Sequence, residues 1–126
     1  MKPVTAVPTV RVVLADDHDL VRSGIKALLT MIKGVDVIAE ARNGQELVTL
    51  TESLNPDVVM TDISMPVMDG IAAIAQLHQS RPSVRLLVLS MYDTVDFVKR
   101  AVASGACGYL MKDAPPFELE QAIRSV

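Results

Sequence analysis

Hydrophobic residues along the chain follow two patterns, short continuous runs and longer stretches with a helical period. Three runs are rich in valine and leucine and have the length of strands that are buried on both faces. A fourth segment alternates apolar with polar or small residues, which is typical of a less covered strand at the edge of a sheet. With a further short run near the C-terminus, the pattern predicts strands at 10–15, 35–41, 57–61, 84–90 and 108–111.

Between these runs, apolar residues recur every three or four positions, which marks one face of an amphipathic helix. Gly34 is expected to cap the end of the first helix, and Asn43 with Glu46 has the spacing of a capping box at the start of the second. Pro115 and Pro116 fix the start of the last helix. The predicted stripes are Val21, Ile25, Leu28, Leu29 and Ile32; Leu47, Leu50 and Leu54; Ile71, Ile74 and Leu77; Val95, Val98 and Val102, in a helix from Asp93 or Thr94 to Gly105; and Leu119, Ile123 and Val126.

Five strands that alternate with five helices through short loops predict a parallel sheet covered on both faces. Right-handed crossovers leave few topologies, and the best match is an α/β, flavodoxin-like doubly wound five-stranded parallel sheet with strand order 2-1-3-4-5. This order puts the alternating second strand at an edge. We expect residues 1–9 to form a flexible leader and residues 10–126 to form one domain with its own core.

Polar residues stand where the predicted strands end. Asp16 and Asp17 follow the first strand, Asp62 follows the third, Ser90 ends the fourth and Lys112 follows the fifth. Taken singly, the acids fit a turn or a helix cap and the lysine fits a solvated surface. Because the carboxyl ends of parallel strands meet at one edge, with a crevice at the switch between the first and third strands, we expect all five side chains on one rim.

A crowd of carboxylates in one crevice is costly unless a cation neutralises it. Hard oxygen ligands without histidine or cysteine suit Mg²⁺, which takes one or two carboxylates directly and keeps several waters. Mg²⁺ beside an aspartate nucleophile, with Lys112 and Ser90 to contact the transferring group, is suited to phosphoryl transfer. Pro66 and Gly70 shape the loop after Asp62, and the glycine permits either a positive φ or a close backbone approach.

The composition narrows the class of protein. A formal net charge of −3 argues against nucleic-acid binding by this segment, which would need a clustered basic surface. The one cysteine, Cys107, excludes an intramolecular disulfide and a zinc site, and we expect it half-buried in a reducing compartment. The N-terminus lacks the apolar core of a secretion signal, and no apolar stretch approaches the ~18 residues of a membrane helix. We therefore expect a cytoplasmic protein without a membrane segment.

Four ordered segments, LADDHDLVRSG, DVVMTDISMPVMDG, LVLSMYD and GACGYLMKDAPP, resemble the motifs of response-regulator receiver domains of two-component systems. The similarity is closest to the subfamily in which a LuxR-type helix-turn-helix output domain follows the receiver. It implies that Asp62 accepts a phosphoryl group from a sensor histidine kinase, with Mg²⁺ as cofactor. It further implies that Asp17, Asp62 and the Ser64 carbonyl bind Mg²⁺ directly, that Asp16 binds it through water, that Lys112 contacts the phosphoryl group, and that Ser90 and Tyr109 form a switch pair.

The same resemblance implies a regulatory phosphoacceptor rather than an enzyme, limited to self-catalysed phosphotransfer and slow autodephosphorylation. Phosphorylation is expected to draw Ser90 toward the new group and to let the Tyr109 ring move inward. The surface of the fourth helix, fifth strand and fifth helix would change, and the chain would form a homodimer there. Transcription would be controlled through a DNA-binding domain outside this segment, cut from a longer regulator; a stand-alone receiver in a phosphorelay is the alternative.

A few positions depart from the common letters of that family. Asp19 stands where proline is frequent, Ser90 where threonine is more usual, and the bulky Met91 where many receivers have alanine. Ser64 and Tyr92 lie where side chains shield or admit the water that hydrolyses the phosphoryl group. These positions leave the lifetime of the phosphorylated state open.

Two other functions share parts of this pattern. A Mg²⁺-dependent aspartyl phosphatase also uses an aspartate at a strand end, but it needs a second acid two residues later, where this chain has Ser64. An FMN carrier needs a phosphate loop rich in serine, threonine and glycine and aromatic residues around the ring. This chain has the sequence DDHD at that loop, with two tyrosines, two phenylalanines and no tryptophan. A receiver that only docks partners is disfavoured because all the required side chains are present.

Overall fold

The predicted strands all form, with almost the predicted bounds, in a computed structural model that describes residues 9–91 and 95–125. Strands β1 (Val10–Ala15), β2 (Val35–Ala41) and β5 (Gly108–Met111) match the prediction. Strands β3 (Val58–Thr61) and β4 (Arg85–Ser90) begin one residue later. Just before β3, Asp57 still contacts β1, because its carboxylate accepts a 2.8 Å hydrogen bond from the Arg11 N–H and its own N–H donates to the Arg11 carbonyl at 2.9 Å.

The helices form at the predicted places. Asn43 caps the second helix as predicted, because its side chain accepts a 2.8 Å hydrogen bond from the Glu46 N–H. The expected start of the fourth helix at Asp93 or Thr94, and Val126 in the last stripe, lie outside the described residues. None of the described helices is long and apolar enough to cross a membrane. The helix bounds are α1 Asp19–Thr30, α2 Gly44–Leu54, α3 Gly70–Ser80, α4 Val95–Ser104 and α5 Pro116–Ser125.

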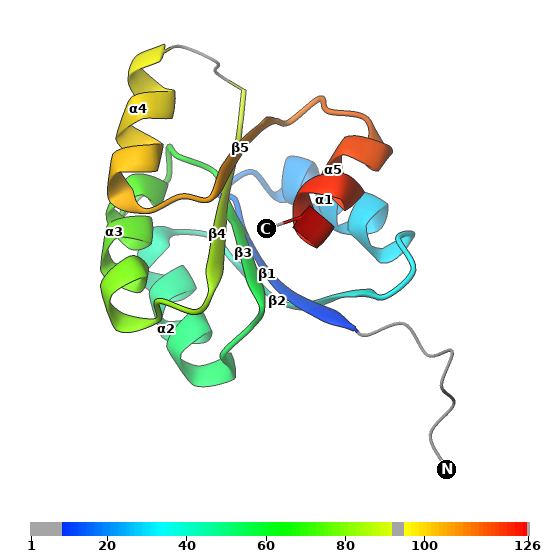
Figure 1. Ribbon diagram of the computed structural model, residues 1–126, viewed down its shortest axis with the longest axis horizontal. Helices are drawn as coiled ribbons and strands as arrows, with labels where there is room; N and C mark the ends of the chain where they lie inside the picture. Colours follow the sequence, from blue (N-terminus) through cyan, green and yellow to red (C-terminus); the bar gives the residue numbers. More distant parts are fainter. Residues whose placement is uncertain (1–8, 92–94, 126) are drawn as a thin grey trace.

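The strands form one parallel sheet in the order β2-β1-β3-β4-β5, which confirms the predicted topology. Helices α2, α3 and α4 cover one face, and α1 and α5 cover the other (Figure 1). The alternating strand β2 lies at an edge, as its pattern predicted. All carboxyl ends of the strands therefore meet at one edge of a doubly wound sheet.

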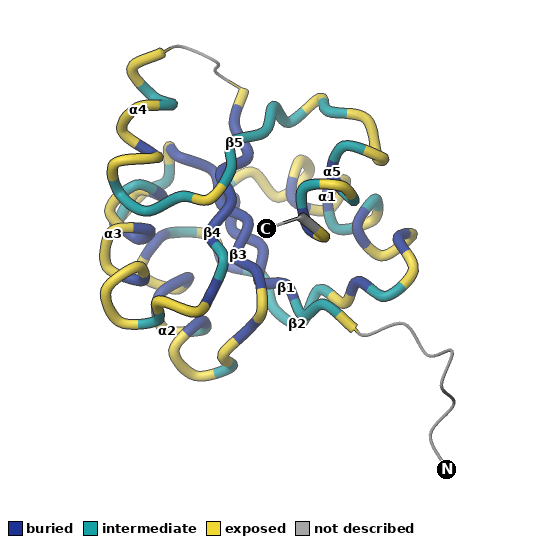
Figure 2. Tube along the Cα trace, viewed as in Figure 1, coloured by how far each residue is buried: buried dark blue, intermediate teal, exposed yellow. Residues whose placement is uncertain are grey.

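Two hydrophobic cores fill the two faces of the sheet, because side chains alternate sides along each strand. In β1, Val13 and Ala15 belong to the core under α2, α3 and α4, whereas Val12 and Leu14 belong to the core under α1 and α5. Buried residues run along the central strands, and exposed residues lie on the outer sides of the helices (Figure 2). The central strands are thus held from both sides, which gives the residues at their ends a rigid support.

The first helix differs from the prediction in its end and its buried face. It ends at Thr30, and Gly34 lies beyond it with a φ of 82° in the turn before β2, so the predicted cap is wrong. There the Gly34 carbonyl accepts a 2.7 Å hydrogen bond from the Val10 N–H. Val21 is 36% exposed whereas Arg22 is buried. Arg22 takes the inner position because it has hydrogen-bond partners there, the Glu40 carboxylate and the Asp16 carbonyl.

The fourth helix also presents a different face to the core. Val95 and Val102 are 67% and 60% exposed, so their predicted burial is wrong. Ala101 is fully buried instead, and Phe97 packs against the same core. A small side chain lets the helix lie close to α3, and the two β-branched residues are left outside. Cys107, expected to be half-buried, is exposed.

Candidate functional site

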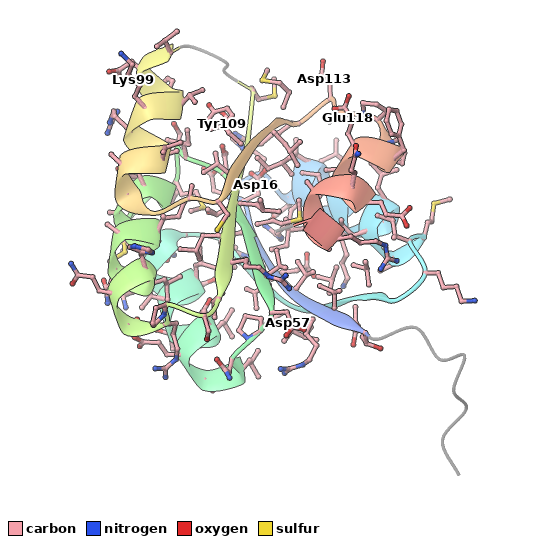
Figure 3. All side chains as sticks on the ribbon, in the orientation of Figure 1. Asp16, Asp57, Lys99, Tyr109, Asp113 and Glu118 are labelled. Atoms are coloured by element: carbon pink, nitrogen blue, oxygen red, sulfur yellow. The ribbon has the colours of Figure 1, made fainter. Side chains whose placement is uncertain are left out.

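Two carboxylates and one ammonium group meet at the carboxyl edge of the sheet. Lys112 Nζ lies 2.7 Å from Asp16 Oδ2 and 3.0 Å from Asp62 Oδ2. These residues follow β5, β1 and β3, and all three side chains are at least nine-tenths buried. Asp57, at the amino end of β3, lies at the other end of the sheet from Asp16 (Figure 3). The rim predicted from the strand ends is therefore present for these three residues.

Backbone hydrogen bonds between neighbouring strands continue one residue beyond the ends of β1, β3 and β5. The Asp16 N–H donates to the Ala41 carbonyl at 3.0 Å, and the Asp62 N–H donates to the Ala15 carbonyl at 3.0 Å. In the same way the Lys112 N–H donates to the Ser90 carbonyl at 2.8 Å. Each functional side chain thus leaves the backbone at a position that the neighbouring strand fixes.

Asp17 and His18 complete an acidic cluster with Asp16 and Asp62, in which each residue has a ligand atom within 4.8 Å of the others. The Asp16 carboxylate accepts a 2.9 Å hydrogen bond from the His18 N–H. His18 Nδ1 lies 3.1 Å from Asp16 Oδ1 and 3.2 Å from Asp17 Oδ1. Oδ1 of Asp17 is buried and accepts no hydrogen bond from the described residues. An oxygen in that position is available as a ligand.

Burial and charge act in opposite directions on the two central groups. Burial raises the pKa of the Asp62 carboxyl above its ordinary value, and the hydrogen bond and charge of Lys112 only partly offset this. Burial alone would lower the pKa of Lys112, but its hydrogen bonds to Asp16 and Asp62 raise it. The lysine therefore stays charged, while the ionised form of Asp62 is held at a cost.

This donor set fits a hard divalent cation. Carboxylate oxygens from Asp16, Asp17 and Asp62 converge, and Asp17 Oδ1 is buried with only the His18 ring nitrogen, at 3.2 Å, beside it among the described ion pairs. Mg²⁺ prefers such oxygens and keeps part of its water shell, which the open side of the cluster permits. That side is a depression lined by Asp17, His18, Ser64, Met65, Pro66 and Asp69. Ser64 itself is exposed on the rim of this depression.

Gly70 places the loop after β3 directly against the backbone of Asp62. A Cβ atom on this glycine would lie 1.9 Å from the Asp62 carbonyl oxygen. The Gly70 N–H donates to the Ile63 carbonyl at 2.7 Å, and its φ is not among the positive values. Of the two roles that the sequence left open, close approach is the correct one. Within the loop, Val67 has a φ of 68° between Pro66 and Met68, whose carbonyl and N–H are joined by a 2.7 Å hydrogen bond.

The two predicted switch residues lie on the neighbouring strands β4 and β5, two positions apart in register. Ser90 is fully buried at the end of β4, beside Met111 in β5. Tyr109 is partly buried, pairs with Val88 and packs against the core under α2, α3 and α4. Met91 is 65% exposed just after Ser90. Tyr92, assigned a part in admitting water, lies outside the described residues.

Arg22 is a site residue that the sequence did not reveal. Its Nη1 donates to the Asp16 main-chain carbonyl at 2.7 Å, and its Nη2 donates to Asp19 Oδ1 at 2.8 Å. Its Nε donates to Glu40 Oε1 at 3.1 Å. The available signal was an acid three residues earlier in a helix, which is also the spacing of an ordinary surface pair. Asp19, noted for the absence of proline, is therefore a partner of this arginine.

Comparison with known proteins agrees with the geometry. The family model described as response regulator receiver domain matches residues 12–124. The transcriptional regulatory protein DegU of Brevibacillus brevis is 38% identical over 117 residues, which cover 93% of this chain and 50% of that protein. The chain thus spans about half the length of the curated relatives it matches.

Solved structures have the same fold. A two-component response regulator of the LuxR family from Aurantimonas sp. SI85-9A1 superposes with a TM-score of 0.88 at 36% identity, covering 93% of this chain and 84% of that chain. CheY of Borrelia burgdorferi, in a complex with CheX, BeF₃ and Mg²⁺, gives a TM-score of 0.85 at 25% identity, covering 94% and 89% of the two chains.

Proposed function

Because the chain belongs to the response regulator receiver domain family, we propose that Asp62 accepts a phosphoryl group from a histidine kinase of a two-component system. The observation that carries the proposal is the contact of Lys112 Nζ with both Asp16 Oδ2 and Asp62 Oδ2, at 2.7 and 3.0 Å. A cation beside an acceptor carboxylate can stabilise the charge on a phosphoryl group as it is transferred.

We assign the metal site to the same rim. Asp17, Asp62 and the Ser64 carbonyl would bind Mg²⁺ directly, and Asp16 would bind it through water. The buried Asp17 Oδ1, which accepts no hydrogen bond from the described residues, supports this assignment, as does the presence of Mg²⁺ and BeF₃ in the complex of the similar CheY. When bound, the ion neutralises charge on the phosphoryl oxygens and on the acids.

In the transfer step, a carboxylate oxygen of Asp62 attacks phosphorus and the bond from phosphorus to the donor imidazole nitrogen breaks. The electron pair of that bond stays on the imidazole. Lys112 would contact the transferred phosphoryl group, since its ammonium already lies against the acceptor oxygen. The Ile63 N–H, which donates to Asp62 Oδ1 at 2.8 Å, holds the carboxylate in one orientation during attack. Ser90 would donate a hydrogen bond to a phosphoryl oxygen.

The output is a change of surface rather than turnover of a substrate. Ser90 and Tyr109 would move toward the phosphoryl group together, and α4, β5 and α5 would shift and form a homodimer. The exposed Val95 and Val102 on α4 support an interface on this side. Autodephosphorylation would be slow and would return the domain to the resting state. We assign the domain to the cytoplasm, where its partner kinase would act. An exposed free cysteine, Cys107, is typical of such a reducing compartment.

Our proposal for the activity of the whole protein is based on its relatives. The chain spans half of a transcriptional regulator, DegU, and resembles a regulator of the LuxR family. We assign it to control of transcription through a DNA-binding output domain in the remaining half. Its own net charge of −3 leaves DNA binding to that domain.

Incubation with acetyl phosphate and Mg²⁺ tests the phosphoacceptor directly. Wild type should gain the mass of one phosphoryl group, and the adduct should be absent in Asp62→Asn and after chelation of the metal with EDTA. Asp57→Asn is the matched control, because Asp57 lies at the other end of β3 and should leave the adduct unchanged. An adduct of equal yield on Asp62→Asn would contradict the assignment.

A further inference from the structure

Arg22 connects three elements at the carboxyl edge of the sheet, although burial of its charge is costly. The residue is 8% exposed and lies in the first turns of α1. One guanidinium nitrogen bonds the Asp16 carbonyl after β1, a second bonds Glu40 in β2, and a third bonds Asp19 at the start of α1. A planar guanidinium that is held at three points has little freedom to move.

The Asp16 carbonyl belongs to the planar peptide unit that leads into Asp17. On its other side, Asp16 is fixed by the hydrogen bond from its N–H to the Ala41 carbonyl of β2. Arg22 Nη1 then fixes the carbonyl itself, at 2.7 Å. With its N–H held by β2 and its carbonyl held by Arg22 of α1, Asp16 sets the direction in which the chain continues to Asp17. Asp17 carries the buried Oδ1, which makes no hydrogen bond with the described residues and has His18 Nδ1 3.2 Å away.

Glu40 and Lys26 hold the guanidinium in place. Glu40 accepts from Arg22 Nε and, at 3.0 Å, from Lys26 Nζ, so two cations face two acids when Asp19 is included. The network is therefore neutral as a whole. Its influence on the rim is exerted through the geometry of the peptide unit rather than through excess charge.

We propose that Arg22 is a positioning residue of the phosphoacceptor site, which holds the Asp16–Asp17 peptide unit so that the Asp17 carboxylate stays close enough to Asp62 for the two to hold one Mg²⁺. The inference rests on the proposed function, since it concerns the same metal site. Arg22 touches neither the ion nor the phosphoryl group in this scheme. Residues that orient metal ligands in this way change metal affinity by roughly 10- to 100-fold when they are replaced.

The test compares Mg²⁺ affinity with metal-free stability in Arg22→Met and wild type. The Mg²⁺ Kd is measured by titration of the backbone amide NMR signals of Ile63 and Asp17, and the unfolding midpoint is measured in EDTA. Arg22→Met should weaken Mg²⁺ binding about tenfold or more in protein that remains folded. Arg11→Met is the matched control, because Arg11 also donates to two main-chain carbonyls, at Leu54 and Asn55, but at the amino end of the sheet. It should keep the wild-type Kd.

A purely structural arginine would give a different result. It would lower the metal-free midpoint of Arg22→Met and leave the Mg²⁺ Kd at the wild-type value, which would overturn the inference. If Arg22→Met does not fold, Arg22→Lys carries the test, because a single Nζ cannot bond the carbonyl and Glu40 as a fork does. Its Kd should rise at least about threefold, and an unchanged Kd in that folded variant would also overturn the inference. Wild type that neither binds Mg²⁺ nor forms the acetyl phosphate adduct would instead contradict the proposed function itself.

Discussion

The Lys112 ammonium lies 3.0 Å from Oδ2 of Asp62, so the acceptor carboxylate is already paired with the cation proposed to follow the phosphoryl group. The same ammonium lies 2.7 Å from Asp16 Oδ2. One lysine therefore compensates two buried acids. This arrangement links the stability of the fold to the chemistry of its rim, because each change of charge there alters both.

Replacement of Lys112 by methionine should destabilise the metal-free protein strongly. Two buried carboxylates would lose their cation, and loss of one partner from a buried ion pair costs about 3 kcal/mol or more. Mg²⁺ should restore part of the loss, because the ion neutralises the same oxygens. Urea unfolding with and without Mg²⁺ measures both effects.

Lys26→Met is the control for that substitution. Lys26 pairs with Glu40 at 3.0 Å, and its side chain is 45% exposed. An exposed pair of this kind contributes less than about 1 kcal/mol. Equal losses in the two variants would show that the Lys112 contacts do not carry the stability of the rim.

Gly70→Ala should disrupt the support of Asp62. The added Cβ would lie 1.9 Å from the Asp62 carbonyl oxygen and 2.9 Å from its carbon, so the loop or the strand end must move. We expect a loss of about 3 kcal/mol in the unfolding free energy and a weaker Mg²⁺ affinity. Gly24→Ala in α1 is the matched control, since its Cβ meets nothing within 4 Å. Alanine is the better helix former, so this variant should gain up to about 1 kcal/mol.

The sequence predicted the sheet and most of the rim for one physical reason. A buried strand must be apolar, so each run ends where a polar residue first appears, and Asp16, Asp62 and Lys112 stand at those ends. Parallel topology then brings the ends together without any knowledge of side-chain contacts. The position of Ser90 at the end of β4 follows in the same way.

Other features depended on contacts between distant parts of the chain. Arg22 is buried because it bonds Glu40, an acid 18 residues later, and the carbonyl of Asp16. The helical period of the sequence reveals neither partner. In α4, the residues Val95 and Val102 form as good an apolar stripe as Phe97 and Ala101 do. Only packing against α3 decides between the two faces, and it favours the small alanine.

Glu40→Gln should reduce stability at neutral pH and have little effect in acid. Burial raises the pKa of the Glu40 carboxyl, but hydrogen bonds and charge from Lys26 and Arg22 hold it below its ordinary value of 4.5 in the folded protein. A lowered folded pKa stabilises the protein above 4.5, and this stabilisation disappears as the pH falls through the folded value. We expect Glu40→Gln to be less stable than wild type by about 2 kcal/mol at pH 7. This difference should disappear once the pH is well below the folded pKa of Glu40.

Urea unfolding of wild type and Glu40→Gln across the acid range measures this difference. Glu52→Gln serves as the control, because Glu52 is exposed on α2 and should follow wild type at every pH. A constant difference between wild type and Glu40→Gln from neutral pH into strong acid would contradict the role assigned to the carboxylate charge.

Thr51→Val should stabilise the protein without touching the rim. Thr51 is fully buried in α2, and its Oγ1 has no hydrogen-bond partner among the described residues. Its hydroxyl therefore loses its water on folding and gains nothing in return, whereas a methyl group of similar shape carries no such cost. Valine and threonine have similar helix propensities, so the backbone adds little. We expect about 1 kcal/mol in urea unfolding, with the exposed Thr49→Val within about 0.5 kcal/mol of wild type. A loss of stability in Thr51→Val would mean that the hydroxyl has a partner, such as an ordered water, that α2 requires.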